Sequence, residues 1–303
     1  MIACICSYFN YNGNKLRREL YEKFRENFNH PIITAEVALK EGDFCISDSH
    51  KILANENNVL WQKERTFNII LETLPPEYDK IVWLDTDLKF HNPDWLDEMD
   101  KKLDEHLMVQ GFENVFETEG YNNVLNCRGY GKNIYDFERS TKLIDEHFAL
   151  GLVWGINRSY IPEGFYDRHI LGSNDAMQIV GAMGDFLNSQ LVGCCTPNIV
   201  LDFLDYSERQ PIKDTYSIGY CEGDLEHFYH GDKLDRGYIE REIILDNYKF
   251  NPKLLEIDEQ NGLYKLPNMY KELQEEIRHY FQDRSDTTKN EKNLHTVPWK
   301  NWF

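Results

Sequence analysis

Two patterns of apolar residues alternate along the first part of the chain. Short continuous apolar runs are typical of buried strands, whereas apolar residues at every third or fourth position indicate one face of a helix. On these criteria the sequence predicts strand, helix, strand, helix and strand, at residues 2–6, 16–28, 32–39, 58–74 and 81–84. Strand–helix–strand units with short loops predict right-handed crossovers and a mostly parallel sheet with helices on both faces.

Beyond the third predicted strand the pattern is less regular. Residues 113–139 are rich in Asn, Gly and Tyr, which predicts a mobile loop. Apolar residues return at 150–157, and another short strand is predicted to end at 228–231. In open parallel sheets, ligands bind beyond the carboxyl ends of the strands, so the residues after each strand are the candidates for function.

The last part of the chain carries few strand signals. One amphipathic helix is predicted at 269–281, and the polar stretch 285–295 is expected to be mobile. The sequence therefore predicts an α/β domain over residues 1–245, followed by a mainly helical extension and tail over 246–303.

The charge of the chain narrows the class of partner. Among 303 residues, 33 are basic and 52 acidic, which gives a net charge of −19. A protein that binds nucleic acid non-specifically needs a basic surface, because it displaces counterions from the phosphates. The densest basic stretches, at 15–18 and 233–241, lie among acidic residues. Nucleic acid and acidic membrane surfaces are therefore disfavoured as partners.

The N-terminus and the cysteines bear on location. The first residues carry no basic segment and turn polar after one strand's length, which does not fit a signal peptide. No apolar run reaches the roughly 18 residues that a membrane-spanning helix needs. Cys4 with Cys6, and Cys194 with Cys195, do not have the spacing of a structural zinc site. We expect reduced thiols in the cytoplasm, or in the host cytoplasm if the protein is viral.

The sharpest motif follows the third predicted strand. Residues 81–84 are apolar and lead into Asp85-Thr86-Asp87. If the strand continues, both carboxylates point to one side, because side chains alternate with period two. Two hard oxygen ligands suit Mg²⁺ or Mn²⁺, which in turn bind phosphate oxygens. The alternative is a solvated turn that caps a helix beginning near Asn92.

A candidate catalytic acid lies further along the chain. Gly172-Ser173-Asn174-Asp175 precedes a predicted helix, and Gly172 would allow a ligand to approach the backbone closely. A carboxylate at Asp175 can accept a proton from an alcohol nucleophile. The alternative is that Asn174 or Asp175 only caps the helix.

Two histidines lie at the end of the last predicted strand. A neutral imidazole of either His227 or His230 can complete a Mn²⁺ site beside two carboxylates. His230 is favoured, because the neighbouring Gly231 permits close approach. Lys233 is placed to neutralise a departing diphosphate.

Taken in order, these motifs resemble a known family. An N-terminal strand precedes Asp85-Thr86-Asp87, Gly151-x-x-Trp154-Gly155, Gly172-Ser173-Asn174-Asp175 and His230-Gly231. The set resembles metal-dependent glycosyltransferases of the GT-A fold, in particular the β-galactosyltransferase-like pattern. The segment from Leu60 through Asp87 is also similar to uncharacterised viral and bacterial proteins of this class. The resemblance covers roughly residues 1–240, and it departs at Asn174, where the family usually has Glu.

The resemblance implies a GT-A fold and a metal-dependent, inverting glycosyltransferase. It would use Mn²⁺ or Mg²⁺ to transfer a sugar from a nucleoside-diphosphate donor, a UDP-sugar, to a hydroxyl of a glycan or small molecule. It assigns the metal to Asp85, Asp87 and His230 and the catalytic base to Asp175. Position assigns the donor to Ser7, Tyr8, Asn10, Gln62, Arg65, Asp85 and Lys233, and the acceptor to Trp154, Tyr166 and Asn174.

Three other functions stay open at this point. A nucleotidyltransferase would need a glycine-rich basic loop after the first strand, but residues 7–14 contain one glycine and no basic residue. An inactive sugar- or nucleotide-binding module is disfavoured because both acids of the motif and His230 are retained. Glycosylation of modified DNA bases is the third, and the charge of −19 counts against it.

Overall fold

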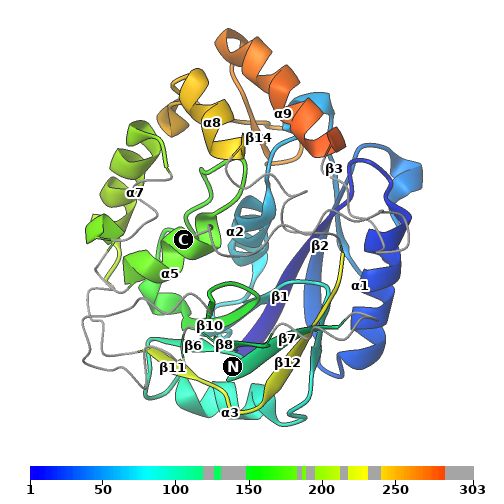
Figure 1. Ribbon diagram of the computed structural model, residues 1–303, viewed down its shortest axis with the longest axis vertical. Helices are drawn as coiled ribbons and strands as arrows, with labels where there is room; N and C mark the ends of the chain where they lie inside the picture. Colours follow the sequence, from blue (N-terminus) through cyan, green and yellow to red (C-terminus); the bar gives the residue numbers. More distant parts are fainter. Residues whose placement is uncertain are drawn as a thin grey trace.

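A seven-stranded sheet forms the centre of the protein (Figure 1). The computed structural model describes residues 1–118, 126–129, 131, 148–182, 186–188, 195–211, 218–230 and 240–283. In the order β11-β6-β10-β4-β1-β2-β3, the strands are Ile218–Tyr220, Met108–Gln110, Val153–Asn157, Lys80–Leu84, Ile2–Phe9, Ile32–Ala38 and His50–Leu53. Only β10 runs antiparallel to its neighbours. The predicted mixed α/β class with a mostly parallel sheet is confirmed.

The central strands are buried on both faces. In β1, Ile5 joins one apolar cluster and Cys6 the other, and in β4, Trp83 and Leu84 divide in the same way. This division follows from the alternation of side chains along a strand. Helices α1 (Lys15–Asn27) and α3 (Trp95–Lys102) bury apolar side chains in one cluster. Helices α2 (Lys63–Thr73), α5 (Asn174–Ala182) and α7 (Pro197–Arg209) bury theirs in the other.

The second helix begins later than its sequence pattern predicts. Helix α2 starts at Lys63, whereas the prediction began at residue 58. A 3-10 turn, η2 (Glu56–Asn58), stands in its place, and the amide of Trp61 donates to the carbonyl of Ile170 at 2.8 Å. The apolar residues Leu60 and Trp61 fit the helical period of the sequence, but they are not helical. The backbone there is held by the distant loop that contains Ile170.

A second sheet of five strands contains β12, which confirms the short strand predicted to end at 228–231, and four strands that the sequence did not predict. Its order is β5-β12-β7-β8-β9, formed by Leu88–Phe90, Asp224–Phe228, Asn114–Thr118, Asn126–Gly129 and Phe148–Ala149. The prediction of a loop over 113–139 is therefore wrong for β7 and β8. Strand β7 pairs with β12, which follows much later in the sequence, so its partner is not visible in local patterning.

The C-terminal segments pack onto the same core as the central sheet. They comprise α8 (Glu240–Asn247), η6 (Pro252–Leu254), β13 (Glu256–Ile257), β14 (Tyr264–Lys265), η7 (Asn268–Tyr270) and α9 (Lys271–Asp283). Helix α9 confirms the predicted helix with a shift of its start, and α8 and α9 lie together at the top of Figure 1. Leu263, Leu273 and Ile277 belong to the cluster that covers α2. The domain boundary at residue 245 stays a prediction, and 285–295 lies outside the described residues.

Short 3-10 turns complete the regular structure of the described part. They are η1 (Glu41–Asp43), η3 (Arg158–Tyr160) and η4 (Phe186–Asn188). Every helix in the described ranges is too short or too polar to cross a lipid bilayer.

Candidate active site

The acidic motif lies where β4 passes into β5. Residues 85–87 form a bend, so the prediction that strand alternation points both carboxylates to one side is wrong. The amide of Asp85 donates to the carbonyl of Leu152 at 2.9 Å, and the carbonyl of Asp87 accepts from Phe228 at 2.8 Å. The bend therefore holds the two acids against different parts of the chain, and each joins a separate group of side chains.

Asp87 faces two histidines. Its Oδ2 atom lies 3.1 Å from Nε2 of His230 and 3.6 Å from Nε2 of His227. Burial acts to raise the pKa of Asp87, but the two histidines outweigh it and hold that pKa well below its usual range. The other oxygen, Oδ1, is buried and has no hydrogen-bond partner among the described residues.

The second sheet is what brings these histidines to the motif. Strand β12 pairs antiparallel with β5, and His227 stands opposite Leu88, the residue after Asp87. Both imidazoles are buried, and one ligand atom from each residue of the trio lies within 4.8 Å of the others. The sequence favoured His230 over His227, whereas the structure places both beside Asp87. Gly231 and Lys233 lie outside the described residues.

This trio fits a divalent cation. One carboxylate and two imidazoles are a donor set that Mn²⁺ accepts, and a buried carboxylate oxygen without a partner is costly unless something binds it. Asp87 Oδ1 is such an atom. Asp85 does not belong to this trio, because its carboxylate faces a lysine.

Lys63, the first residue of α2, lies between two acids. Its Nζ atom is 2.6 Å from Oδ1 of Asp85 and 3.7 Å from Oδ2 of Asp175. The lysine side chain is only 8% exposed, against 31% for Asp85 and 27% for Asp175. Burial acts to lower the pKa of Lys63, but the neighbouring carboxylates raise it above its usual value. The ammonium group is therefore charged at neutral pH and holds both acids on one side of the site.

Glu64 supplies a further carboxyl group, which is buried. Its Oε2 atom accepts a hydrogen bond from Nδ2 of Asn174 at 3.0 Å. Burial raises the pKa of Glu64 to about 7, with a contribution from Asp175 and against the effect of Lys63. The family pattern has Glu where this chain has Asn174, and here a carboxyl group from α2 lies against that asparagine. Glu64 is thus a carboxyl group that can gain or lose a proton near neutral pH.

The wall around Asp175 is built from backbone in left-handed conformations. Leu152 has φ of 79° and Ser173 has φ of 73°, both unusual for residues other than glycine. A side chain at Gly151 would lie 3.2 Å from Oδ2 of Asp175. Strained backbone of this kind is concentrated at functional sites, where the surrounding structure holds it. Both turns flank Asp175, the residue that the sequence assigns as the base.

Three residues assigned to the acceptor are not accessible. Trp154 is 0% exposed and its indole nitrogen donates to the carbonyl of Leu150. Tyr166 is equally buried, and its hydroxyl donates to Asp202. The amide of Asn174 is used by Glu64 and by the backbone of His169. The prediction that these side chains contact an acceptor is therefore wrong for the described structure, since each is part of the core.

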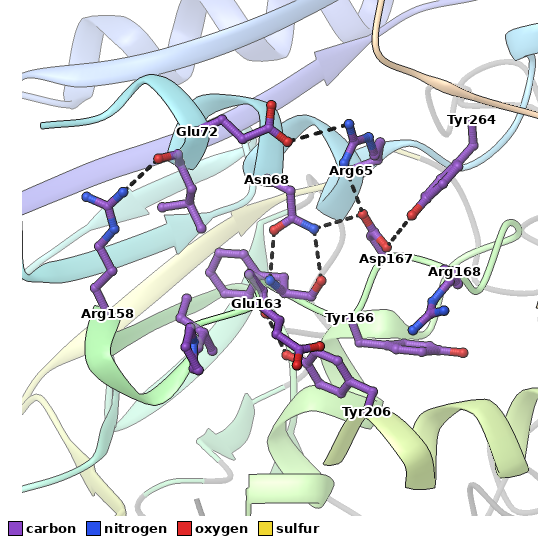
Figure 2. A pocket seen from close by; sticks show the side chains of 15 residues that line it. Arg65, Asn68, Glu72, Arg158, Glu163, Tyr166, Asp167, Arg168, Tyr206 and Tyr264 are labelled. Carbon is purple, nitrogen blue, oxygen red and sulfur yellow. Dashed lines mark hydrogen bonds and ion pairs between the residues drawn. The ribbon is translucent and has the colours of Figure 1, made fainter. Parts of the chain in front are cut away.

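Two residues at the start of α2, the N-cap Gln62 and the helical residue Arg65, were assigned to the donor and are also engaged elsewhere. Gln62 is buried, and its amide bonds to the backbone of Asn58 and Tyr264. Figure 2 shows Arg65 in a cavity of about 380 Å³, pointing toward Asp167 and Glu72. Lys63 contacts Asp85 and Asp175, and Glu64 contacts Asn174, whereas Gln62 and Arg65 bond elsewhere. The sequence therefore assigned the donor contacts to the wrong residues at the start of this helix.

The first loop shows a similar outcome. The hydroxyl of Ser7 accepts a hydrogen bond from Thr66 at 2.8 Å, and Ser7 follows Cys6, which pairs with Leu84 of β4. Tyr8 packs into the core against Tyr21, so its ring cannot stack on a base. The side chain of Asn10 closes its own loop through Asn14. Of the three, Ser7 stands nearest in register to Asp85.

Lys63 and Glu64 are the residues that sequence reasoning missed as site residues. The signal was a run of three charged residues, 63–65, at the start of a helix whose later residues include the apolar Phe67, Ile70 and Leu71. Charged side chains at positions that a helix buries need partners, which points to a site.

Comparison with known proteins gives structural likenesses only. No family model and no curated protein sequence matches the chain. TarS 1–349 from S. aureus in complex with UDP-GlcNAc is 11% identical, with a TM-score of 0.41 over 82% of this chain and 63% of that one. The mannosyltransferase PcManGT from Pyrobaculum calidifontis in complex with GDP-Man and Mn²⁺ is 11% identical, with a TM-score of 0.41 over 92% and 69%.

The galactosyltransferase LgtC, in complex with donor and acceptor sugar analogs, is 13% identical, with a TM-score of 0.30 over 90% of this chain and 100% of that one. In its matches to TarS, this chain spans 55% and 63% of the TarS chain. At these identities and TM-scores the likenesses assign no role to any residue, and the argument for function rests on the site.

Proposed function

We propose that the chain is a metal-dependent glycosyltransferase of the GT-A type. It transfers a sugar from a nucleoside-diphosphate donor, a UDP-sugar, to a hydroxyl of a glycan or a small molecule, with inversion. The observation that supports this most is the convergence of Asp87, His227 and His230 beside β4, next to Lys63 and its acids. A cation site and a candidate base then lie at the carboxyl edge of the sheet, where α/β proteins bind nucleotides.

Asp87 and His230, with His227 beside them, are the residues that would hold the cation. When bound, Mn²⁺ or Mg²⁺ supplies positive charge for the diphosphate of the donor. Asp85 is retained as a donor-binding residue, because its carboxylate is partly exposed and is oriented by Lys63. The sequence assigned Asp85 to the metal as well, but its carboxylate pairs with Lys63 and lies outside the trio.

Asp175 is the base in this proposal. Its carboxylate is partly exposed, and its Oδ2 atom lies 3.7 Å from Nζ of Lys63. The acceptor oxygen attacks the anomeric carbon from the face opposite the diphosphate, and the bond from that carbon to the diphosphate breaks. The electron pair leaves with the diphosphate, and the hydroxyl proton passes to Asp175. Attack on the opposite face inverts the anomeric centre.

Thermal unfolding with a panel of nucleotide-sugars tests the proposal. A UDP-sugar is expected to raise Tm in the presence of Mn²⁺ and to raise it less without the metal, since a ligand stabilises the folded state by mass action. Slow release of UDP should accompany binding when water replaces the acceptor. If no nucleotide-sugar changes Tm with either Mn²⁺ or Mg²⁺, the proposal is wrong.

The same assays separate the alternatives. A nucleotidyltransferase would be stabilised by a nucleoside triphosphate and would release pyrophosphate. An inactive binding module would bind a nucleotide-sugar without ever releasing UDP. Glycosylation of DNA requires binding to duplex DNA that weakens steeply with salt, followed by labelled sugar on that DNA.

A further inference from the structure

A second group of potential ligands lies apart from Asp87 and its histidines. His169 comes from the loop before α5, Cys195 precedes the first residue of α7, and Glu242 is in α8. One potential ligand atom from each lies within 4.8 Å of the others. Three segments far apart in the sequence thus deliver a nitrogen, a sulfur and an oxygen atom to one place.

The histidine of this group is buried and not fully satisfied. His169 is 0% exposed, and its Nε2 atom lies 3.0 Å from Oε2 of Glu242. Its other ring nitrogen, Nδ1, has no hydrogen-bond partner within the described ranges. A buried polar atom without a partner costs free energy, and either ring nitrogen of a neutral imidazole can bind a metal.

We propose that His169, Cys195 and Glu242 bind a zinc ion. Thiolate, imidazole and carboxylate are the ligands that Zn²⁺ takes in proteins, and with bond lengths of about 2.0 to 2.3 Å they lie roughly 3 to 4 Å apart around it. The ligand atoms already lie within 4.8 Å of one another, so small movements of the side chains reach that geometry. Three protein ligands leave a fourth position for water.

The charges around the group favour this metal over a hard cation. A thiolate and a carboxylate give two negative charges, and a sulfur ligand selects zinc over Mg²⁺. The second oxygen of Glu242 faces Arg241 at 3.6 Å, so that its Oε2 atom is the one directed at His169. The sequence analysis considered only the spacing of neighbouring cysteines, and it missed this site because the three ligands lie on separate segments.

The site connects to the proposed active site through backbone. The amide of His169 donates to Oδ1 of Asn174 at 2.9 Å, and its carbonyl accepts from Nδ2 of Asn174 at 3.0 Å. The same Nδ2 atom also donates to Glu64. Zinc on His169 therefore fixes the loop that holds Asn174 and Glu64, and it ties α8 and the start of α7 to that loop.

Cobalt binding tests the proposal on the full chain. Metal-free protein is titrated with Co²⁺, whose bond to a thiolate gives a charge-transfer absorption in the near ultraviolet, and Zn²⁺ is then added to displace it. Wild type and Asp87→Ala should show the band, and Cys195→Ser should lose it. Cys45→Ser, which changes another partly buried cysteine, is the matched control and should keep it.

Zinc content gives an independent count. At saturation, Cys195→Ser and His169→Gln should each hold one zinc ion fewer than wild type, and Cys45→Ser should hold as many as wild type. A folded wild-type protein without the cobalt band overturns the proposal, as does a band of full strength in Cys195→Ser. The wild-type spectrum decides even if the variants do not fold. Its outcome is independent of nucleotide-sugar binding, so the zinc site and the glycosyltransferase proposal can fail separately.

Discussion

Lys63 and Asp85 form an ion pair at the point where the chain leaves β4, with Nζ 2.6 Å from Oδ1. The lysine is buried and the aspartate partly exposed, and Oδ2 of Asp175 lies 3.7 Å from the same ammonium group. One lysine therefore sets the positions of two carboxylates that the sequence assigns to separate tasks.

Replacing Lys63 with methionine should destabilise the fold and weaken donor binding. The change leaves Asp85 and Asp175 without their shared cation. Loss of one partner from a buried pair costs several kcal/mol, and the partial exposure of the acids reduces this to roughly 1–3 kcal/mol. Urea unfolding measures the first effect, and the Tm shift with a UDP-sugar and Mn²⁺ measures the second.

Lys80→Met is the matched control. Lys80 is also buried and also contacts two carboxylates, those of Asp100 and Asp104, on α3 and just after it. The Lys80→Met variant should be less stable than wild type and should keep the Tm shift with the UDP-sugar and Mn²⁺. An equal loss of response in both variants would mean that Lys63 acts only on the fold.

Glu64→Gln should change the dependence of stability on pH. The pKa of Glu64 is raised from 4.5 to about 7 by burial, so between these values the folded state holds a proton that the unfolded state has lost. Stability therefore falls as pH rises through this window. The glutamine variant should match wild type near pH 4 and exceed it at pH 8 by up to roughly 3 kcal/mol, since one pKa unit corresponds to about 1.4 kcal/mol.

Unfolding by urea at several pH values measures this difference. Glu72→Gln serves as the control, because Glu72 is on the same helix but largely exposed, and its slope should equal that of wild type. If the stability of Glu64→Gln instead runs parallel to that of wild type from pH 4 to 8, folding does not raise the pKa of Glu64.

Local patterning was enough to predict β1, β2 and β4 of the central sheet. Residues of β1 and β4 form continuous apolar runs, because both faces of these strands are buried. Of the second sheet only β12 was predicted, since β7 is short and pairs with β12 across a long separation in the sequence. The position of this sheet matters more for function than its size, because β12 is the strand that carries His227 to Asp87.

The site was predicted at the level of motifs and missed at the level of contacts. Asp87, His230 and Asp175 follow strands or precede a helix, which local sequence shows. Trp154 and Tyr166 have aromatic rings of the kind that stack on sugars, but both rings are buried in the core. Local sequence does not distinguish an aromatic residue that binds a sugar from one that packs in the core. Lys63 was missed because its partners, Asp85 and Asp175, belong to distant segments.

Replacing either histidine beside Asp87 should weaken metal binding. Each imidazole contributes one ligand to a cation, so His230→Ala and His227→Ala should each raise the Mn²⁺ concentration needed for half-maximal binding of the UDP-sugar, and together should abolish the metal effect. His91→Ala is the control, since His91 is in the same region of the second sheet but pairs with Glu226. Titration of Mn²⁺ at fixed donor, followed by Tm, measures the change. Unaltered metal dependence in the double variant would exclude this site.

Asp175→Asn should remove transfer and leave donor binding in place. The amide is close in size to the carboxylate but cannot take the acceptor proton, and a general base contributes roughly 100- to 10,000-fold to a rate. The turnover number should therefore fall within that range, while the Tm shift with a UDP-sugar and Mn²⁺ is kept. Asp205→Asn, at an exposed ion pair with Lys253, should transfer sugar at the wild-type rate. If Asp175→Asn transfers sugar as fast as that control, the base is another residue, and Glu64, with its pKa of about 7, is the next to replace.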